Sequence, residues 1–170
     1  FKMPAVWEWL CEDNDDWSIK AYRSKQTEDH KRKAGVIAFD GKVTLSVDER
    51  LLVRAREGCK FSNFILAHEI GHLALDHHGR GAVTKNFQLF SGPRGMSNIP
   101  PTSEELEANY AAVFFQCGTF LTDERISSLD LANRACSDPY YVRKAQMVIK
   151  VDEFRRELRR LKAKAPRVVL

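Results

Sequence analysis

The segment 61–75 constrains the fold of this chain more than any other. It is apolar, free of proline and long enough for a buried helix, yet it contains His68, Glu69 and His72. Ionisable side chains inside an apolar helix need a partner, because burying them unpaired is costly. The sequence therefore predicts a buried helix that carries a polar site.

The spacing of these three residues indicates what the site holds. Two histidines four positions apart lie about one helical turn apart, so both imidazoles project from one face and can bind one tetrahedral zinc ion. Glu69 lies next to His68, close enough to accept a proton from a metal-held water. H-E-x-x-H on a helix is the signature of zinc peptidases, with the glutamate as general base. We expect Zn²⁺ with His68 and His72 as ligands and Glu69 as catalytic base, although Mn²⁺ also fits such ligands.

A catalytic zinc site needs a third protein ligand and an open fourth position. One candidate is a glutamate from the segment 104–107, carried on a second helix that crosses the first. The other is His78, which occupies the last position of the longer pattern H-E-x-x-H-x-x-G-x-x-H. Leu75 stands where that pattern has glycine, so we expect the helix to run on and to carry His78 away from His72. The glutamate is the better candidate.

Two motifs resemble those of the ImmA/IrrE metallopeptidases. They are Phe64-x-x-Ala67-His68-Glu69-Ile70-Gly71-His72-Leu73-x-Leu75 and, downstream, Glu105-x-x-Ala108-Asn109-x-x-Ala112. The resemblance covers about residues 35–150 and implies that Glu105 is the third ligand, with Glu107 as the alternative. It also implies site-specific cleavage of a helix-turn-helix transcriptional repressor. The segment 114–118 departs from the family, which leaves the pocket wall and the substrate preference open.

Two further residues of the second motif's helix are candidates for supporting roles. Asn109 lies one turn beyond Glu105 on the same face, where it could orient a metal ligand. Tyr110 could reach a tetrahedral oxyanion, although an aromatic residue on an apolar helix more often belongs to the core.

The order of the expected elements indicates an α+β, mostly helical domain, and the resemblance implies that its fold is that of a minigluzincin-like metallopeptidase. A small antiparallel β-sheet precedes the active-site helix, since 36–39 and 43–47 flank Asp40-Gly41, a strong hairpin signal. The other expected elements are an N-terminal helix and loop over 4–24 that pack aromatic residues on the core, a short helix over 49–57, the active-site helix over 60–77, a long loop over 79–101, and a helix that begins at Thr102 or Ser103 and continues through Phe115. We assign 1–120 to the metallopeptidase core and 121–170 to a helical C-terminal region of the same continuous domain.

Length and composition favour a protein of the cytoplasm. At 170 residues the chain has no apolar run of membrane-spanning length and no secretory pattern, so we expect no membrane partner. Its four cysteines are scattered without a C-x-x-C pair, which favours buried thiols in a reduced compartment. The net charge of +4 is uneven, because residues 143–167 carry ten Lys or Arg against three acids.

The C-terminal region supports a rival hypothesis, a DNA- or protein-binding module. Residues 131–143 resemble a helix-turn-helix, in which Ser137 would cap the second helix and Val142 would pack back. A basic terminal helix follows, with nucleic-acid-binding candidates Arg155, Arg156, Arg159 and Arg160. A charged face on a terminal helix is more often simply exposed to solvent. The resemblance also implies that a helix pair of this kind is part of the ImmA/IrrE domain itself. A third possibility is a regulator with a silent metal site that acts by binding its repressor.

Overall fold

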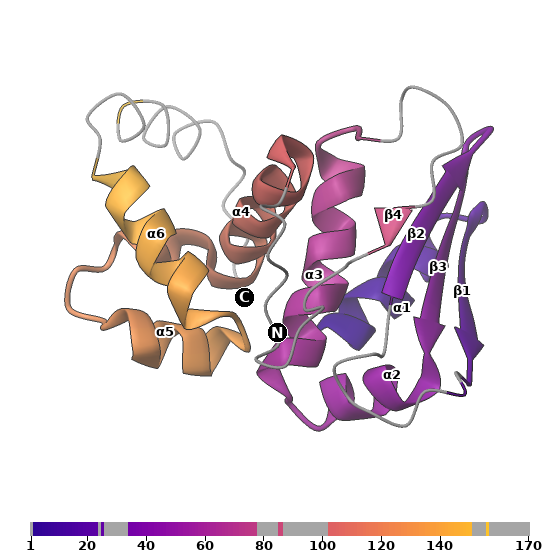
Figure 1. Cartoon of the computed structure of the whole chain (residues 1–170), viewed down its shortest axis with the longest axis horizontal. Coiled ribbons are helices and arrows are strands. Elements are labelled where there is room, and N and C mark those ends of the chain that lie inside the picture. Colours follow the sequence, from indigo (N-terminus) through magenta and orange to yellow (C-terminus); the bar gives the residue numbers. More distant parts are fainter. Residues whose placement is uncertain are drawn as a thin grey trace.

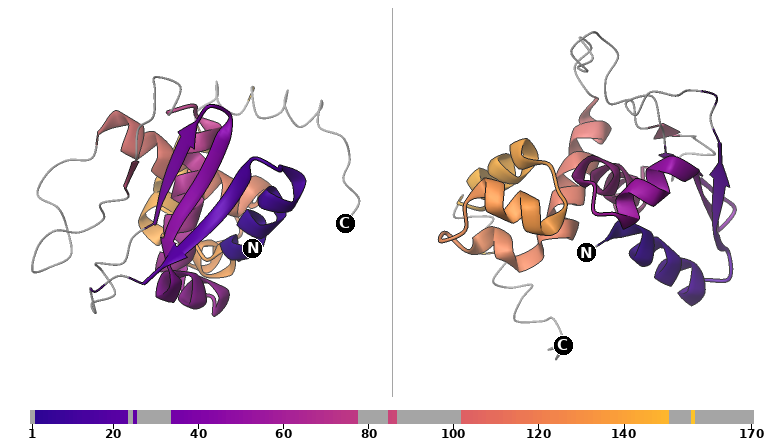
Figure 2. Two further views of the ribbon diagram at one scale, coloured as in Figure 1. Left: turned by 90° about the vertical axis from the view of Figure 1, so that its right-hand side faces the viewer. Right: turned by 90° about the horizontal axis from the view of Figure 1, so that it is seen from below.

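The computed structural model describes residues 2–23, 25, 34–77, 85–86, 102–150 and 156. The protein has an α+β fold in which helices cover one face of a small sheet, and further helices extend away from it (Figure 1). Figure 2 (left) looks onto the opposite face of the sheet. The α+β class predicted from the sequence is therefore confirmed.

The sheet is mixed, which corrects the expectation of an antiparallel one. Its strand order is β1-β3-β2-β4. The strands are β1 (Trp17–Tyr22), β2 (Ala34–Phe39), β3 (Lys42–Asp48) and β4 (Lys85–Asn86). Strand β2 pairs antiparallel with both β3 and β4, whereas β1 pairs parallel with β3 over its whole length. Only a helix and a loop were expected over 4–24, so strand β1 was missed. It pairs with residues 26 positions further along the chain, and such a pairing leaves no local signal in the sequence.

The β2–β3 hairpin forms where the sequence predicts it. Asp40 and Gly41 both have positive φ angles, 50° and 76°, as a type I′ turn requires. Side chains of β3 alternate as expected, since Val43, Leu45 and Val47 are buried and the residues between them are only partly so. This face of the sheet packs against the helices and forms one side of the core.

Helix α1 (Met3–Asp13) attaches to the helix that carries the site. Trp7 is fully buried and its Nε1 donates to the carbonyl oxygen of Leu66 at 3.1 Å. The backbone amide of Met3 donates to Oδ1 of Asn63, a buried side chain, at 2.7 Å. Trp9, by contrast, is 58% exposed, so not every aromatic residue of this segment packs on the core as expected.

The active-site helix is shorter than predicted. Helix α2 (Glu49–Arg56) precedes it as expected, and α3 extends over Lys60–Ala74 and not to 77. Asp76 adopts the left-handed region with φ 54°, and the amides of Asp76 and His77 donate back to the carbonyls of Leu73 and His72. This is a Schellman ending with aspartate in the position usually taken by glycine, so the missing glycine at 75 does not let the helix run on.

The remaining helices form the second half of the molecule. They are α4 (Ser103–Cys117), the 3₁₀ helix η2 (Gly118–Thr122), α5 (Ser128–Ala135) and α6 (Pro139–Ile149). Thr102 caps α4, and its hydroxyl accepts from the amide of Glu105, in agreement with the predicted start. Asp138, and not Ser137, caps α6, because its carboxylate accepts from the amides of Tyr140 and Tyr141.

This half is joined to the rest mainly through α3, because α4 packs along α3 (Figures 1 and 2). Within the half, α6 packs on both α4 and α5. Val142 of α6 is fully buried, as the sequence predicts. Of the four cysteines only Cys117 is buried, and the other three are half-buried. Within the described ranges, each helix is too short or too polar to cross a bilayer.

Candidate metal centre

Helix α3 carries its polar residues into the core. His68, Glu69 and His72 have no exposed surface, and the apolar residues on the same helix, such as Ile65 and Leu66, are buried as well. The helix is therefore enclosed on all sides over residues 62–72, and these three side chains cannot be stabilised by bulk water. Their partners must come from the protein or from a bound ligand.

A glycine allows α4 to approach α3 closely at this point. A Cβ atom added to Gly71 would lie 2.7 Å from the carbonyl oxygen of Ala108 and 3.1 Å from its Cα. Only a residue without a side chain permits this approach. Because Glu105 lies about one turn before Ala108 on α4, the contact brings its carboxylate to the two histidines.

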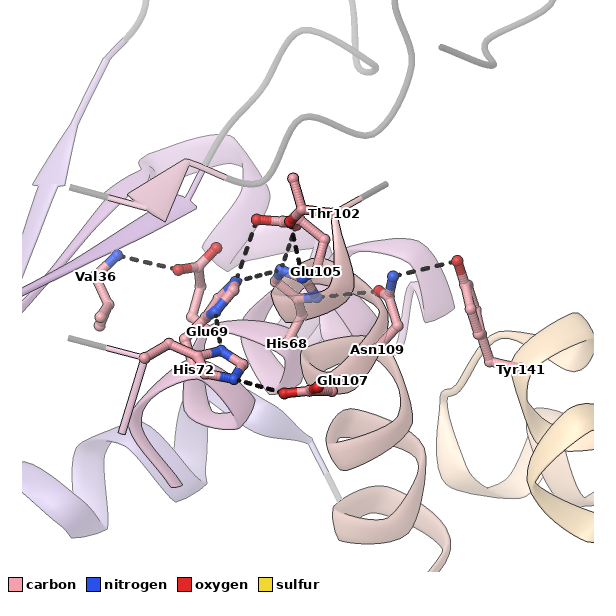
Figure 3. A network of polar contacts seen from close by, with 10 residues as sticks. Val36, His68, Glu69, His72, Thr102, Glu105, Glu107, Asn109 and Tyr141 are labelled. Atoms are coloured by element: carbon pink, nitrogen blue, oxygen red, sulfur yellow. Dashed lines mark hydrogen bonds and ion pairs between the residues drawn. The ribbon is translucent and has the colours of Figure 1, made fainter. Parts of the chain in front are cut away.

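Three potential ligands converge on one point (Figure 3). The Nε2 atoms of His68 and His72 lie 2.9 Å apart. One carboxylate oxygen of Glu105 lies 3.2 Å from Nε2 of His68, and the other lies 3.5 Å from Nε2 of His72. The structure thus brings together the two histidines and the third ligand expected from the family resemblance.

The protonation of His68 is fixed by its neighbour Asn109. Oδ1 of Asn109 lies 3.0 Å from Nδ1 of His68, and Nδ2 of Asn109 donates to the hydroxyl of Tyr141 at 3.2 Å. An amide oxygen only accepts, so Nδ1 of His68 is the donor. Its Nε2 then presents a lone pair to His72 and Glu105, which is the tautomer that a metal ligand needs.

This donor set fits a divalent transition ion. Two imidazole nitrogens and a carboxylate oxygen are the ligands of catalytic zinc sites, and bond lengths of about 2.0–2.2 Å at tetrahedral angles place ligand atoms roughly 3.3 Å apart. The observed separations of 2.9, 3.2 and 3.5 Å bracket that value. The side chain of Glu105 is 26% exposed, so the point of convergence lies near the surface of the core.

Glu69 lies beside the three ligands, but its hydrogen bond is to the sheet. Its Oε2 accepts from the backbone amide of Val36 in β2 at 3.0 Å. Within the described part of the chain, no donor lies within hydrogen-bonding distance of its buried Oε1. Burial raises the pKa of Glu69 well above its usual value, although the hydrogen bond from Val36 acts in the opposite direction. A buried carboxylate oxygen without a partner is ready to accept a proton from a molecule in the site.

The electrostatics of the other groups suit cation binding. Burial lowers the pKa of His68, which keeps its imidazole neutral at neutral pH. Burial alone would raise the pKa of Glu105, but the hydrogen bonds and charge of His68 and His72 outweigh it and lower that pKa to about 2. Neutral imidazoles and an ionised carboxylate are the forms that bind a metal ion.

Other residues named from the sequence lie around this centre. Tyr110 is partly buried against the core, with its ring edge-on to that of Tyr141, and its oxyanion role stays a prediction. Glu107 is 60% exposed and pairs with His77 at 3.2 Å, so it does not compete with Glu105 for the ligand position. His78 and the candidates Arg155, Arg159 and Arg160 lie outside the described residues, whereas Arg156 is helical and exposed.

Sequence analysis missed two participants. Tyr141 contacts Asn109 from a helix 32 positions away, and nothing near it in the sequence signals this. His77 was placed only at the end of the expected active-site helix, but its Nδ1 lies 2.8 Å from Nδ1 of His72. The polar run Asp76-His77 at the end of an apolar helix was the only hint of that contact.

The chain was also compared with known proteins. No protein-family model matches it, and no curated protein and no solved structure is significantly similar to it.

Proposed function

We propose that this protein is a metal-dependent peptidase in which His68, His72 and Glu105 hold Zn²⁺ and Glu69 acts as general base. The observation that carries the proposal is the convergence of three ligand atoms beside a buried glutamate whose Oε1 has no partner among the described residues. A structural zinc site is usually closed by four protein ligands, whereas three ligands beside a free carboxylate oxygen are typical of a hydrolytic site.

The residues of the site have separate roles in the proposed reaction. Bound zinc would supply Lewis-acid chemistry, lowering the pKa of water and polarising a carbonyl group. Glu69 accepts the proton of the attacking water on Oε1 and returns it to the leaving amine, while its Oε2 stays on the Val36 amide. That bond holds the carboxylate in place, and Asn109 holds the ring of His68.

The family and the substrate follow from the resemblance of the two motifs. We infer a minigluzincin-like fold of the ImmA/IrrE type, acting in the cytoplasm on a helix-turn-helix repressor that it cuts at one site. The short mixed sheet, the H-E-x-x-H helix behind it and the third ligand on the following helix support this inference. Because a regulatory protease must spare most proteins, we expect general unfolded substrates to be poor ones.

Cleavage and metal binding should be tested on the same samples. The full chain, stripped with a chelator and reloaded with Zn²⁺ or Mn²⁺, is incubated with the helix-turn-helix repressor encoded beside its gene. We expect two fragments, and none without metal. The variant Glu69→Gln should keep bound zinc but lose cleavage, whereas Glu12→Gln, the same change at an exposed position of α1, should leave both intact. An intact repressor under every metal contradicts this substrate assignment.

The Glu69→Gln variant also separates the enzyme from a silent regulator. A regulator that acts by binding would still relieve repression with this substitution, because only proton transfer is removed. A reporter gene under the repressor's control measures the difference. We expect relief of repression with the wild-type chain and none with Glu69→Gln.

One observation favours a second activity, DNA binding. Helices α5 and α6 are joined by three residues, with Cys136 in the left-handed region, as in a helix-turn-helix. Helix α6 exposes Arg143 and Lys144. If this pair binds duplex DNA, the affinity should fall steeply with salt concentration and drop further in Arg143→Ala.

A further inference from the structure

The Schellman ending of α3 folds the chain back over the second histidine of the site. In such an ending the residue two past the helix cap contacts the residue five positions before it, usually through apolar side chains. Here those two residues are His77 and His72, since the amide of His77 donates to the carbonyl of His72 at 3.0 Å. An imidazole thus occupies a position where a hydrophobic residue is normal, and its side chain is only 7% exposed.

The side chains continue the contact as a chain of polar groups. Nδ1 of His77 lies 2.8 Å from Nδ1 of His72, and Nε2 of His77 lies 3.2 Å from a carboxylate oxygen of Glu107 on α4. The carboxylate at the exposed end can only accept, so Nε2 of His77 is the donor there. In neutral His77 the other nitrogen, Nδ1, is then the acceptor, and Nδ1 of His72 must donate to it.

The direction of these hydrogen bonds determines which ring nitrogen of His72 carries no proton. With Nδ1 carrying the proton, Nε2 presents its lone pair toward Nε2 of His68 and the carboxylate of Glu105, at 2.9 and 3.5 Å. We propose that His77, held by Glu107, is a positioning residue that fixes the tautomer and the ring orientation of His72 for metal binding. This inference rests on the metal site proposed above.

The two ligand histidines are therefore supported differently. His68 donates to a neutral amide, that of Asn109, whereas His72 donates to an imidazole backed by a carboxylate. A carboxylate behind a ligand histidine raises its basicity, and loss of such outer partners typically weakens metal affinity about 10- to 100-fold. His77 follows the end of α3 and Glu107 lies on α4, so their contact also ties the end of α3 to the first turns of α4.

The test measures Zn²⁺ affinity of the full chain by competition with a chromophoric chelator. We expect His77→Ala to weaken binding about 10- to 100-fold. In His77→Asn, Oδ1 can replace Nδ1 as acceptor, so most of the affinity should return although the link to Glu107 is lost. Glu107→Ala should have a smaller effect and should add nothing in the His77→Ala background. Asp76→Asn, an exposed neighbour whose left-handed φ suits asparagine, is the control and should bind normally.

A spectroscopic readout distinguishes positioning from simple packing. Co²⁺ bound to the wild-type chain gives a visible absorption spectrum that depends on ligand geometry, and His77→Ala should change it while His77→Asn restores it. Unchanged affinity and spectrum in His77→Ala overturn the proposal, as does a failure of asparagine to restore them. If His77→Ala does not fold, the exposed Glu107→Ala must still lower affinity, or the proposal fails. A wild-type chain that binds neither ion overturns the metal site itself and this role with it.

Discussion

Substituting Gly71 by alanine should damage the site although alanine favours helix. In an exposed helix this change is worth about 1 kcal/mol of stability. Here the new Cβ would lie 2.7 Å from the backbone oxygen of Ala108 and 3.2 Å from Cβ of Ala111. Ordinary contacts begin at 3.4 Å, so the two helices must separate by about 0.7 Å. Overpacking of this kind costs about 1–3 kcal/mol, and a backbone atom cannot turn aside.

The expected balance is a modest net loss of stability with a larger effect on metal binding. We expect the free energy of unfolding of the metal-free protein to fall by about 1–2 kcal/mol, since the clash outweighs the gain in helix propensity. Metal sites tolerate ligand shifts of only about 0.2 Å, so displacing the turn that carries Glu105 should weaken Zn²⁺ binding by at least about tenfold. Urea unfolding and chelator competition measure the two quantities.

Two controls isolate the close approach of the helices. Ala74→Gly makes the reverse change at an exposed position of α3, and should cost up to about 1 kcal/mol without altering affinity. Ala108→Gly added to Gly71→Ala should not rescue it, because the shortest contacts are with the backbone of Ala108. A Gly71→Ala protein that is more stable than the wild type and binds Zn²⁺ equally well would refute this account of how α4 is placed.

Three other perturbations probe the same centre. Asn109→Leu removes both the acceptor for His68 and the donor to Tyr141. Zn²⁺ affinity, measured by chelator competition, should therefore fall about 10- to 100-fold, and an unchanged affinity would show that His68 does not need this partner. Calorimetry should show a lower unfolding temperature after chelation, and Zn²⁺ at 100 times its dissociation constant should restore about 2.7 kcal/mol. The folded-state pKa of Glu69 lies above its ordinary value of 4.5, so the metal-free wild type takes up a proton on folding and loses stability as pH rises above 4.5. Glu69→Gln cannot ionise, and its stability advantage in denaturant unfolding should grow with pH over that range.

The parts of the fold that depend on neighbouring residues could be predicted from the sequence. Asp40-Gly41 determines its own turn, and the alternation of β3 determines which side chains are buried. The spacing of His68 and His72 similarly depends only on the geometry of one helix. Each of these features involves residues within a few positions of one another, so the printed sequence contains the whole signal.

The features that were missed or wrongly predicted depend either on residues distant in the sequence or on a choice between residues that are nearly equally suitable. Pairing of β1 with β3 requires a crossover whose register no local pattern encodes, so no strand was predicted within 4–24. Ser137 and Asp138 are both good capping residues, and in the structure Asp138 is the cap because its carboxylate accepts from the amides of Tyr140 and Tyr141. The end of α3 was misplaced because Asp76 takes a conformation that is usually left to glycine or asparagine.

Support for the candidate site comes from both halves of the molecule. The sheet contributes the Val36 amide that holds Glu69, and α6 contributes Tyr141, which contacts Asn109 and through it His68. An enclosed helix can keep three polar residues in a core only if each is partnered, because an unpaired one would destabilise the fold. Among the described residues, the two histidine Nε2 atoms contact each other and Glu105 around the point proposed for the metal, and of the three polar side chains only Oε1 of Glu69 has no hydrogen-bond partner. A fragment that ended at residue 120 would lose the Tyr141 contact, so the C-terminal helices are part of what makes the site, whatever else they bind.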